Sequence, residues 1–152
     1  MIRFNRAIKP FSVMSFDLDD TLYNNHPIIK AAVKAQQDYL NALPSYLAQG
    51  QKYWQQCRNE AVLQLPELAD NVTKWRQHTL RLALAKLDLN EQEVEYHADA
   101  AYNAFADARS KIVVTDDVLK LLDNLAQHFT LVAITNGNVE IERFNLHNKF
   151  EL

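Results

Sequence analysis

A long helical stretch interrupts the strand signals of this chain. From about residue 24 to residue 109 the sequence is rich in Ala, Leu, Gln and Glu and nearly free of strand patterns, so it predicts helices. One strand signal precedes the stretch and others follow it, although a crossover between parallel strands needs only about a dozen residues. The stretch is therefore predicted to be an inserted unit, a small bundle of four helices.

Short apolar runs on both sides of the inserted unit predict a parallel sheet. Val13–Asp17 reads as a buried strand, and Leu131–Ile134 reads as a second one. The apolar run Ile112–Val114 begins a β-α-β-α pattern and is expected to be a further strand. An amphipathic helix over Val118–His128 follows it, and a short helix is expected over Val139–Asn145. Strands that alternate with helices are typical of the α/β class.

Apolar residues in the inserted unit recur at helical spacing, which predicts the faces that are buried. In the first helix the expected face has one polar member, Gln36, and its other members are Ile29, Val33, Leu40 and Leu43. In the last helix the expected face is formed by Val94, Ala98, Ala101 and Phe105.

Composition excludes several classes of protein. The chain has 152 residues, of which 48% are hydrophobic and 23% are charged, as in soluble globular proteins. Its 16 basic and 19 acidic residues give a net charge of −3 without a long basic run, so no nucleic-acid partner is expected. No apolar run is long enough for a membrane span. The single cysteine, Cys57, and the lack of a secretory signal predict a cytoplasmic protein.

Polar clusters follow both strand signals, at Asp17–Thr21 and at Thr135–Gly137. Each cluster alone is equally typical of a solvated turn. Because ligands of open α/β sheets bind at the carboxyl ends of the strands, the two clusters together predict one site. Two carboxylates two residues apart, Asp17 and Asp19, suit a nucleophile and a general acid/base.

Such a concentration of negative charge accepts a phosphate only if a cation neutralises it, and oxygen ligands of this kind suit Mg²⁺. The Thr135 hydroxyl and the backbone N–H groups near Asn136 and Gly137 are candidates to hydrogen-bond phosphoryl oxygens. Glycine at position 137 permits a close approach of the backbone.

These motifs resemble those of a known family. Phe16–Tyr23 (FDLDDTLY) resembles the first motif of haloacid-dehalogenase-like phosphatases, and Leu131–Asn138 (LVAITNGN) resembles the second. The helical stretch lies where this family inserts its cap. The resemblance implies a Rossmann-like parallel-sheet core formed by residues 1–23 and 110–152, with an α-helical bundle cap formed by residues 24–109.

The resemblance also implies a role for each motif residue. Asp17 would attack phosphorus and form an aspartyl-phosphate, and Asp19 would protonate the leaving alcohol and then activate water. The Asp17 carboxylate and the Asp19 backbone carbonyl would bind Mg²⁺. Thr135, Asn136 and Gly137 would hold the phosphoryl group.

Residues just beyond the first motif lead into the cap. Thr21, Tyr23 and Asn24 are expected at the cap hinge or close to substrate, and closure of the cap would exclude water.

The substrate implied is a small phosphorylated metabolite. SFDLDDTLYNNHPII, VTKWR and ARSKIVV are similar to phosphatases that act on FMN and on 5-amino-6-(5-phospho-D-ribitylamino)uracil, a riboflavin precursor. Dehalogenases of the family have a tyrosine where this chain has Asp19, so the second carboxylate favours phosphate ester hydrolysis. A sugar-phosphate mutase, or another hydrolase of the family, stays open.

Family members carry a lysine and an acidic pair after the second motif, and neither is expected here. Lys149 precedes the next strand, whereas the family's lysine follows it, and Phe150–Leu152 resembles the start of that strand. We therefore expect a truncated chain with an incomplete core of two or three strands. The alternative function is an inactive fragment that binds phosphate or Mg²⁺ weakly, or that self-associates through an open sheet edge.

Overall fold

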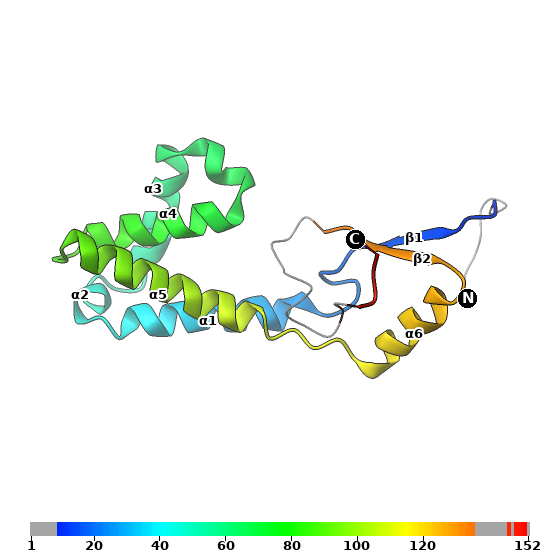
Figure 1. Cartoon of the computed structure of the whole chain (residues 1–152). Coiled ribbons are helices and arrows are strands. Elements are labelled where there is room, and N and C mark those ends of the chain that lie inside the picture. The colour runs from blue at the N-terminus through cyan, green and yellow to red at the C-terminus, as the bar shows by residue number, and fades with distance from the viewer. Residues whose placement is uncertain (1–8, 136–145, 147, 152) are drawn as a thin grey trace. The chain divides into compact units, whose positions relative to one another are not determined.

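The computed structural model describes residues 9–135, 146 and 148–151. The chain divides into two compact units (Figure 1): Met1–His26 with Ile112–Leu152, here the strand unit, and Pro27–Lys111, here the helical unit. These limits differ by two or three residues from the predicted ones at 23/24 and 109/110. That the two units act as core and cap domains with the predicted limits stays a prediction.

The strand unit contains a parallel pair, as predicted from the two apolar runs, but the first strand is not buried as predicted, since Val13 is 54% exposed. β1 (Val13–Phe16) pairs with β2 (Thr130–Ala133), with Val13 opposite Thr130 and Phe16 opposite Ala133. The helix α6 (Asp116–Ala126) packs against β2. Asp116 and Asp117 lie in the first turn of α6, where carboxylates interact favourably with the helix dipole.

The prediction of strand structure at Ile112–Val114 is wrong, because no strand is formed there. Ile112 and Val114 are buried, whereas Val113 is 77% exposed. All three residues are apolar, and such a short apolar run does not distinguish a strand from a connecting segment with one face on the core.

The segment before the last residue lies beside β2. The backbone N–H of Glu151 donates to the carbonyl oxygen of Leu131 at 2.9 Å, and the ring of Phe150 lies 6.2 Å from that of Phe16. Residues 148–151 form no strand in the structure, and Leu152 and the predicted helix over residues 139–145 lie outside the described residues.

The helical unit is formed by four long helices and two short ones. Their bounds are α1 (Asn25–Asn41, which begins in the strand unit), α2 (Pro44–Leu47), α3 (Tyr53–Gln64), the 3₁₀ helix η1 (Pro66–Asp70), α4 (Val72–Ala85) and α5 (Glu91–Arg109). α4 packs against both α3 and α5. No helix among the described residues combines the length and apolarity that crossing a membrane requires.

Local sequence signals set two of the helix limits. Gly50 has a φ of +82° in the turn before α3, a conformation that costs a glycine little. At the start of α5, the Asn90 side chain accepts a hydrogen bond from the Glu93 backbone while the Glu93 side chain accepts one from the Asn90 backbone. This capping box satisfies two N–H groups that the helix leaves unpaired.

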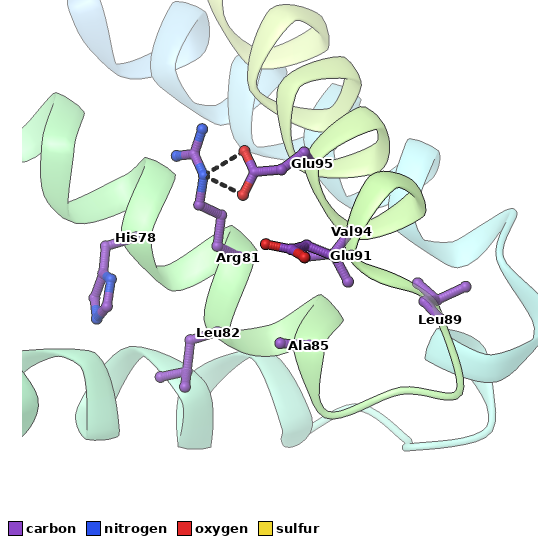
Figure 2. A pocket seen from close by; sticks show the side chains of 8 residues that line it. All are labelled: His78, Arg81, Leu82, Ala85, Leu89, Glu91, Val94 and Glu95. Atoms are coloured by element: carbon purple, nitrogen blue, oxygen red, sulfur yellow. Dashed lines mark hydrogen bonds and ion pairs between the residues drawn. The ribbon is translucent and has the colours of Figure 1, made fainter.

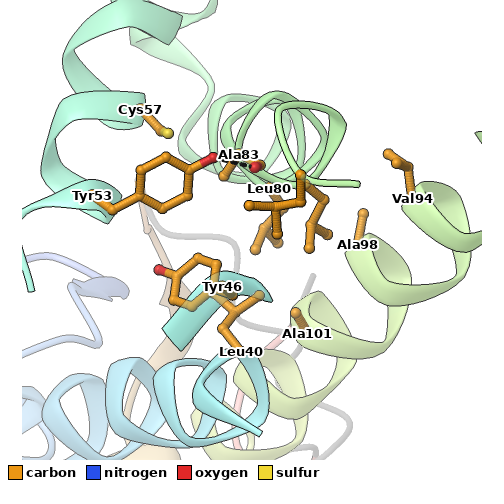
Figure 3. Close-up of a cluster of buried hydrophobic side chains, with 11 residues drawn as sticks. Leu40, Tyr46, Tyr53, Cys57, Leu80, Ala83, Val94, Ala98 and Ala101 are labelled. Atoms are coloured by element: carbon orange, nitrogen blue, oxygen red, sulfur yellow. Dashed lines mark hydrogen bonds between the residues drawn. The ribbon is translucent and has the colours of Figure 1, made fainter. Parts of the chain in front are cut away.

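A cluster of apolar side chains forms the core of the helical unit (Figure 3). Leu80 and Leu84 of α4 are fully buried in it, and the hydroxyl of Tyr53 donates to the carbonyl oxygen of Ala83. The stripe predicted for α5 is buried throughout. In α1 the buried face includes Ala32 instead of Val33, which is 41% exposed.

Candidate active site

The register of the parallel pair brings the two predicted polar clusters to one edge of the sheet. The N–H of Ile134 donates to the carbonyl oxygen of Phe16 at 2.8 Å, just beyond the last paired residues of the strands. Asp17 and Thr135 come next along the chain on the two sides of this bond, and both are exposed. Asn136 and Gly137 lie outside the described residues, so their part in phosphate binding stays a prediction.

A tight turn shapes the loop that follows β1. The carbonyl oxygen of Leu18 accepts hydrogen bonds from the N–H groups of Thr21 (3.3 Å) and Leu22 (3.0 Å). Asp20 has a φ of 58°, in the left-handed region that aspartate tolerates better than most residues. Its carboxylate accepts the N–H of Asn25 at 2.8 Å, which joins the loop to the first turn of α1.

The burial of Leu18 separates the environments of the two predicted catalytic carboxylates. Leu18 is fully buried, Asp17 is exposed and Asp19 is half-buried. The side chains on either side of a buried residue in an extended segment point away from the core. Asp17 is therefore open to an incoming group, whereas Asp19 is partly enclosed.

Hydrogen bonds orient Asp19 through both of its oxygens. The Tyr23 hydroxyl donates to Oδ1, and the Asn25 side-chain amide donates to Oδ2 at 3.2 Å. Asp17 is held less firmly, by the Thr21 hydroxyl at 3.3 Å from its Oδ2. The predicted residues Thr21 and Tyr23 thus lie against the two carboxylates.

Asn25 contacts Asp19 and was not predicted. The predicted Asn24 is exposed, and its side-chain oxygen accepts the N–H of His26 at 3.0 Å. Asn24 precedes the first residue of α1, and its bond from His26 is that of an N-cap residue, for which Asn is strongly preferred. This local signal points to Asn24, and no local signal distinguishes Asn25.

The oxygen donors of the loop fit a small hard cation. Among the described residues, no three His, Cys, Asp or Glu side chains are grouped so as to hold a metal. Mg²⁺ is commonly bound through only one or two carboxylates while it keeps several waters. The carboxylate and carbonyl oxygens of the Asp17–Asp19 segment are of the class that this ion requires.

The side chain of Lys149 is engaged in an ion pair and is not free to bind a phosphate group. Its ammonium group pairs with the carboxylate of Asp123 on α6, and the lysine side chain is 19% exposed. The prediction that Lys149 is a poor substitute for the family's lysine rests on its position before the next strand, and this ion pair is consistent with it.

The helical unit has a pocket of about 380 Å³ between α4 and α5 (Figure 2). Arg81 lines it, and its guanidinium donates to both oxygens of Glu95 at 3.0 and 2.8 Å. A second carboxylate, that of Asp99, lies 3.3 Å from the same guanidinium. Because Arg81 is already neutralised, it offers no unpaired positive charge to a phosphate group.

Comparison with known proteins assigns the family. Residues 11–151 match the haloacid dehalogenase-like hydrolases. The fold resembles the crystal structure of 2-haloacid dehalogenase from Pseudomonas syringae pv. Tomato DC3000, with a TM-score of 0.80 and 28% identity over 93% of this chain and 62% of that one. The chain therefore belongs to the haloacid dehalogenase-like hydrolase family, and the predicted α/β fold with a helical cap is confirmed.

Within this family, the chain is similar to a phosphatase. It is 38% identical over 154 residues to the 5-amino-6-(5-phospho-D-ribitylamino)uracil phosphatase YigB of Escherichia coli (strain K12). The match covers 99% of this chain and 63% of that relative. The resemblance inferred from the two motifs is thus confirmed.

Proposed function

We propose that the chain carries the first catalytic segment of a Mg²⁺-dependent phosphatase that hydrolyses a small phosphorylated metabolite. The observation that carries the proposal is the pair Asp17 and Asp19, in which one carboxylate is exposed and the other is held through both oxygens by Tyr23 and Asn25. One residue is accessible for attack on phosphorus and the other is fixed for proton transfer.

In the first step, an oxygen of the Asp17 carboxylate attacks phosphorus. The ester P–O bond breaks, and protonated Asp19 gives its proton to the oxygen of the leaving alcohol. In the second step, Asp19 accepts a proton from water, whose oxygen attacks the same phosphorus. The P–O bond to Asp17 then breaks, which releases inorganic phosphate and restores the carboxylate.

The other residues at this sheet edge position the phosphoryl group. The Thr135 hydroxyl, with the amides of Asn136 and Gly137, donates hydrogen bonds to phosphoryl oxygens. The Asp17 carboxylate and the Asp19 backbone carbonyl would hold Mg²⁺. Bound at these oxygens, Mg²⁺ supplies the positive charge that lets an anionic substrate approach a carboxylate.

The similarity to YigB supports 5-amino-6-(5-phospho-D-ribitylamino)uracil as the substrate. FMN, which the resemblance of the sequence segments also implies, is the second candidate. Thr21, Tyr23 and Asn24 would lie at the hinge of the cap or close to this substrate. The free and buried Cys57 is consistent with the cytoplasmic location that we propose with this function.

The test is phosphate release from both proposed substrates and from p-nitrophenyl phosphate, with Mg²⁺ and after chelation. It is made on this chain and on a chimera that adds the part of E. coli YigB outside the alignment. We expect Asp17→Asn to abolish turnover. The matched control is Asp20→Asn, because asparagine tolerates the left-handed conformation of Asp20 and can accept the same N–H.

Each result decides between the alternatives. Turnover that survives Asp17→Asn, or a chimera inert on all three esters, contradicts the phosphatase proposal. Transfer of phosphate to a second sugar hydroxyl, without its release, would indicate a mutase. A chimera that is active while the 152-residue chain only binds phosphate or self-associates would identify this chain as the inactive fragment.

A further inference from the structure

The arginine Arg76 occupies a partly desolvated position in the helical unit. It lies on α4, and its Nη1 donates to the side-chain oxygen of Gln36 on α1 at 2.9 Å. The centre of its guanidinium lies 3.7 Å from the centroid of the Phe105 ring on α5. Burial, and secondly the positive charge of Arg58, lower the pKa of Arg76 to about 10. The surroundings therefore disfavour its charged form.

A second arginine, Arg58 on α3, adds to this unbalanced charge. Its guanidinium lies 4.6 Å from the centroid of the Trp75 ring. Among the described residues, neither Arg58 nor Arg76 forms an ion pair with a carboxylate, and the buried indole N–H of Trp75 has no hydrogen-bond partner. Both arginines and Trp75 are half-buried as residues, whereas the indole nitrogen of Trp75 is itself fully buried.

A third arginine, Arg81, differs from Arg58 and Arg76 because it has acidic partners. It lies five residues after Arg76 on the same helix and is neutralised by Glu95 and Asp99. A partly buried cation is ordinarily paired in this way, because an unpaired one costs desolvation energy without recovering it. Arg58 and Arg76 have no such acidic partner among the described residues, and apart from the bond to Gln36 their guanidinium donors are left for another acceptor.

We propose that Arg58 and Arg76 form a binding site for a small oxyanion, a phosphate or a carboxylate, on the helical unit. The oxygens of such a ligand accept hydrogen bonds from the guanidinium forks, and its charge offsets the repulsion between the two arginines. This site is formed entirely by α3, α4 and their neighbours in the helical unit, and it does not depend on the proposed catalytic carboxylates.

The experiment follows the two indole N–H resonances of the ¹⁵N-labelled chain, Trp54 and Trp75, by NMR. Trp54→Phe assigns them. Sodium phosphate and sodium acetate are titrated separately against sodium chloride at equal ionic strength. We expect a saturable shift of the Trp75 resonance, and at least about tenfold weaker binding in Arg58→Gln and in Arg76→Gln. The matched control Arg81→Gln should bind as the wild type does.

The outcomes separate this site from the proposed catalytic one. A response to phosphate alone identifies a phosphoryl ligand, and a response to both anions identifies a site that also takes carboxylates. The proposal is overturned if Trp75 responds to neither anion, or if its response survives both Arg58→Gln and Arg76→Gln. It is also overturned if Thr135→Val removes the response, since phosphate would then be acting from the strand edge. Arg58→Gln keeps the test valid if Arg76→Gln does not fold.

Discussion

The N–H of Ile134 and the carbonyl oxygen of Phe16 form a 2.8 Å hydrogen bond at the carboxyl end of the parallel pair. Because this bond fixes the register there, the chain leaves the sheet at Asp17 on one strand and at Thr135 on the other. If the register of the pair shifted by one residue, every side chain of the shifted strand would move to the opposite face of the sheet. The proposed nucleophile, Asp17, and the proposed phosphate-binding residue, Thr135, therefore lie at the same edge of the sheet because the backbones of the two strands pair in this register.

Asp19→Asn should affect substrates according to their leaving groups. An alkyl phosphate such as FMN needs a proton on its departing oxygen, whereas p-nitrophenolate is stable without one. We expect turnover of the active chain or chimera to fall at least about 10²-fold with FMN and much less with p-nitrophenyl phosphate. Steady-state rates with both esters measure the effect. Equal losses on both would show that Asp19 is not the proton donor.

Tyr23→Phe should lower kcat with little change in KM, because the Tyr23 hydroxyl orients Asp19 through Oδ1. Asn25 still holds the other oxygen, so we expect a loss of about tenfold, or roughly 1.4 kcal/mol of transition-state stabilisation. The pH profile of kcat should also change, which a purely structural role would not produce. Tyr96→Phe, on an exposed residue of α5, is the control. An unchanged profile would remove Tyr23 from the mechanism.

The sequence was sufficient to predict the two strands and the edge at which their polar clusters meet. Apolar runs that end at acidic or Thr-Asn-Gly clusters are local signals, and parallel pairing follows from the class of fold. The buried stripe of α5, from Val94 to Phe105, was also predicted, because a strong helical period fixes which face packs.

Contacts between residues that are distant in the chain could not be predicted from the sequence. Gln36 was expected as the polar member of a buried face, but its partner was not predicted: Arg76, forty residues later, donates to its side-chain oxygen. The support of Asp19 by Asn25 depends on how the loop turns at Asp20. The β-α-β-α pattern predicts a strand at Ile112–Val114, but no strand is formed there, although burial alternates along the segment.

Leu80→Ala should destabilise the helical unit. Leu80 is fully buried in the apolar cluster, so the substitution removes contacts and leaves a cavity, at a cost of about 2–5 kcal/mol. Urea unfolding followed by circular dichroism measures the change. Leu63→Ala makes the same chemical change at a residue that is 80% exposed, and should cost less than about 0.5 kcal/mol. Similar losses in the two variants would contradict the packing described for α4.

Tyr53→Phe should change how stability depends on pH. Burial, with the neighbouring Cys57 thiol, raises the pKa of Tyr53, whose hydroxyl donates to the Ala83 carbonyl. Above about pH 10 the unfolded chain therefore releases this proton more readily than the folded one. The unfolded state then binds fewer protons, so the free energy of unfolding contributed by Tyr53 is complete below pH 10 and falls as the pH rises.

At pH 7 we therefore expect Tyr53→Phe to lose about 1 kcal/mol through the missing hydrogen bond. Between pH 10 and 11.5 its stability should fall less steeply than that of the wild type, so that the difference between the two narrows. Urea unfolding at a series of pH values measures both slopes. Tyr96→Phe, on a side chain that is 69% exposed, is the control for the loss at pH 7 and should be as stable as the wild type there. If the free energies of unfolding of Tyr53→Phe and of the wild type change in parallel with pH, the Tyr53 hydroxyl has the same pKa in the folded and unfolded chains. That result would contradict the burial of Tyr53 in the structure.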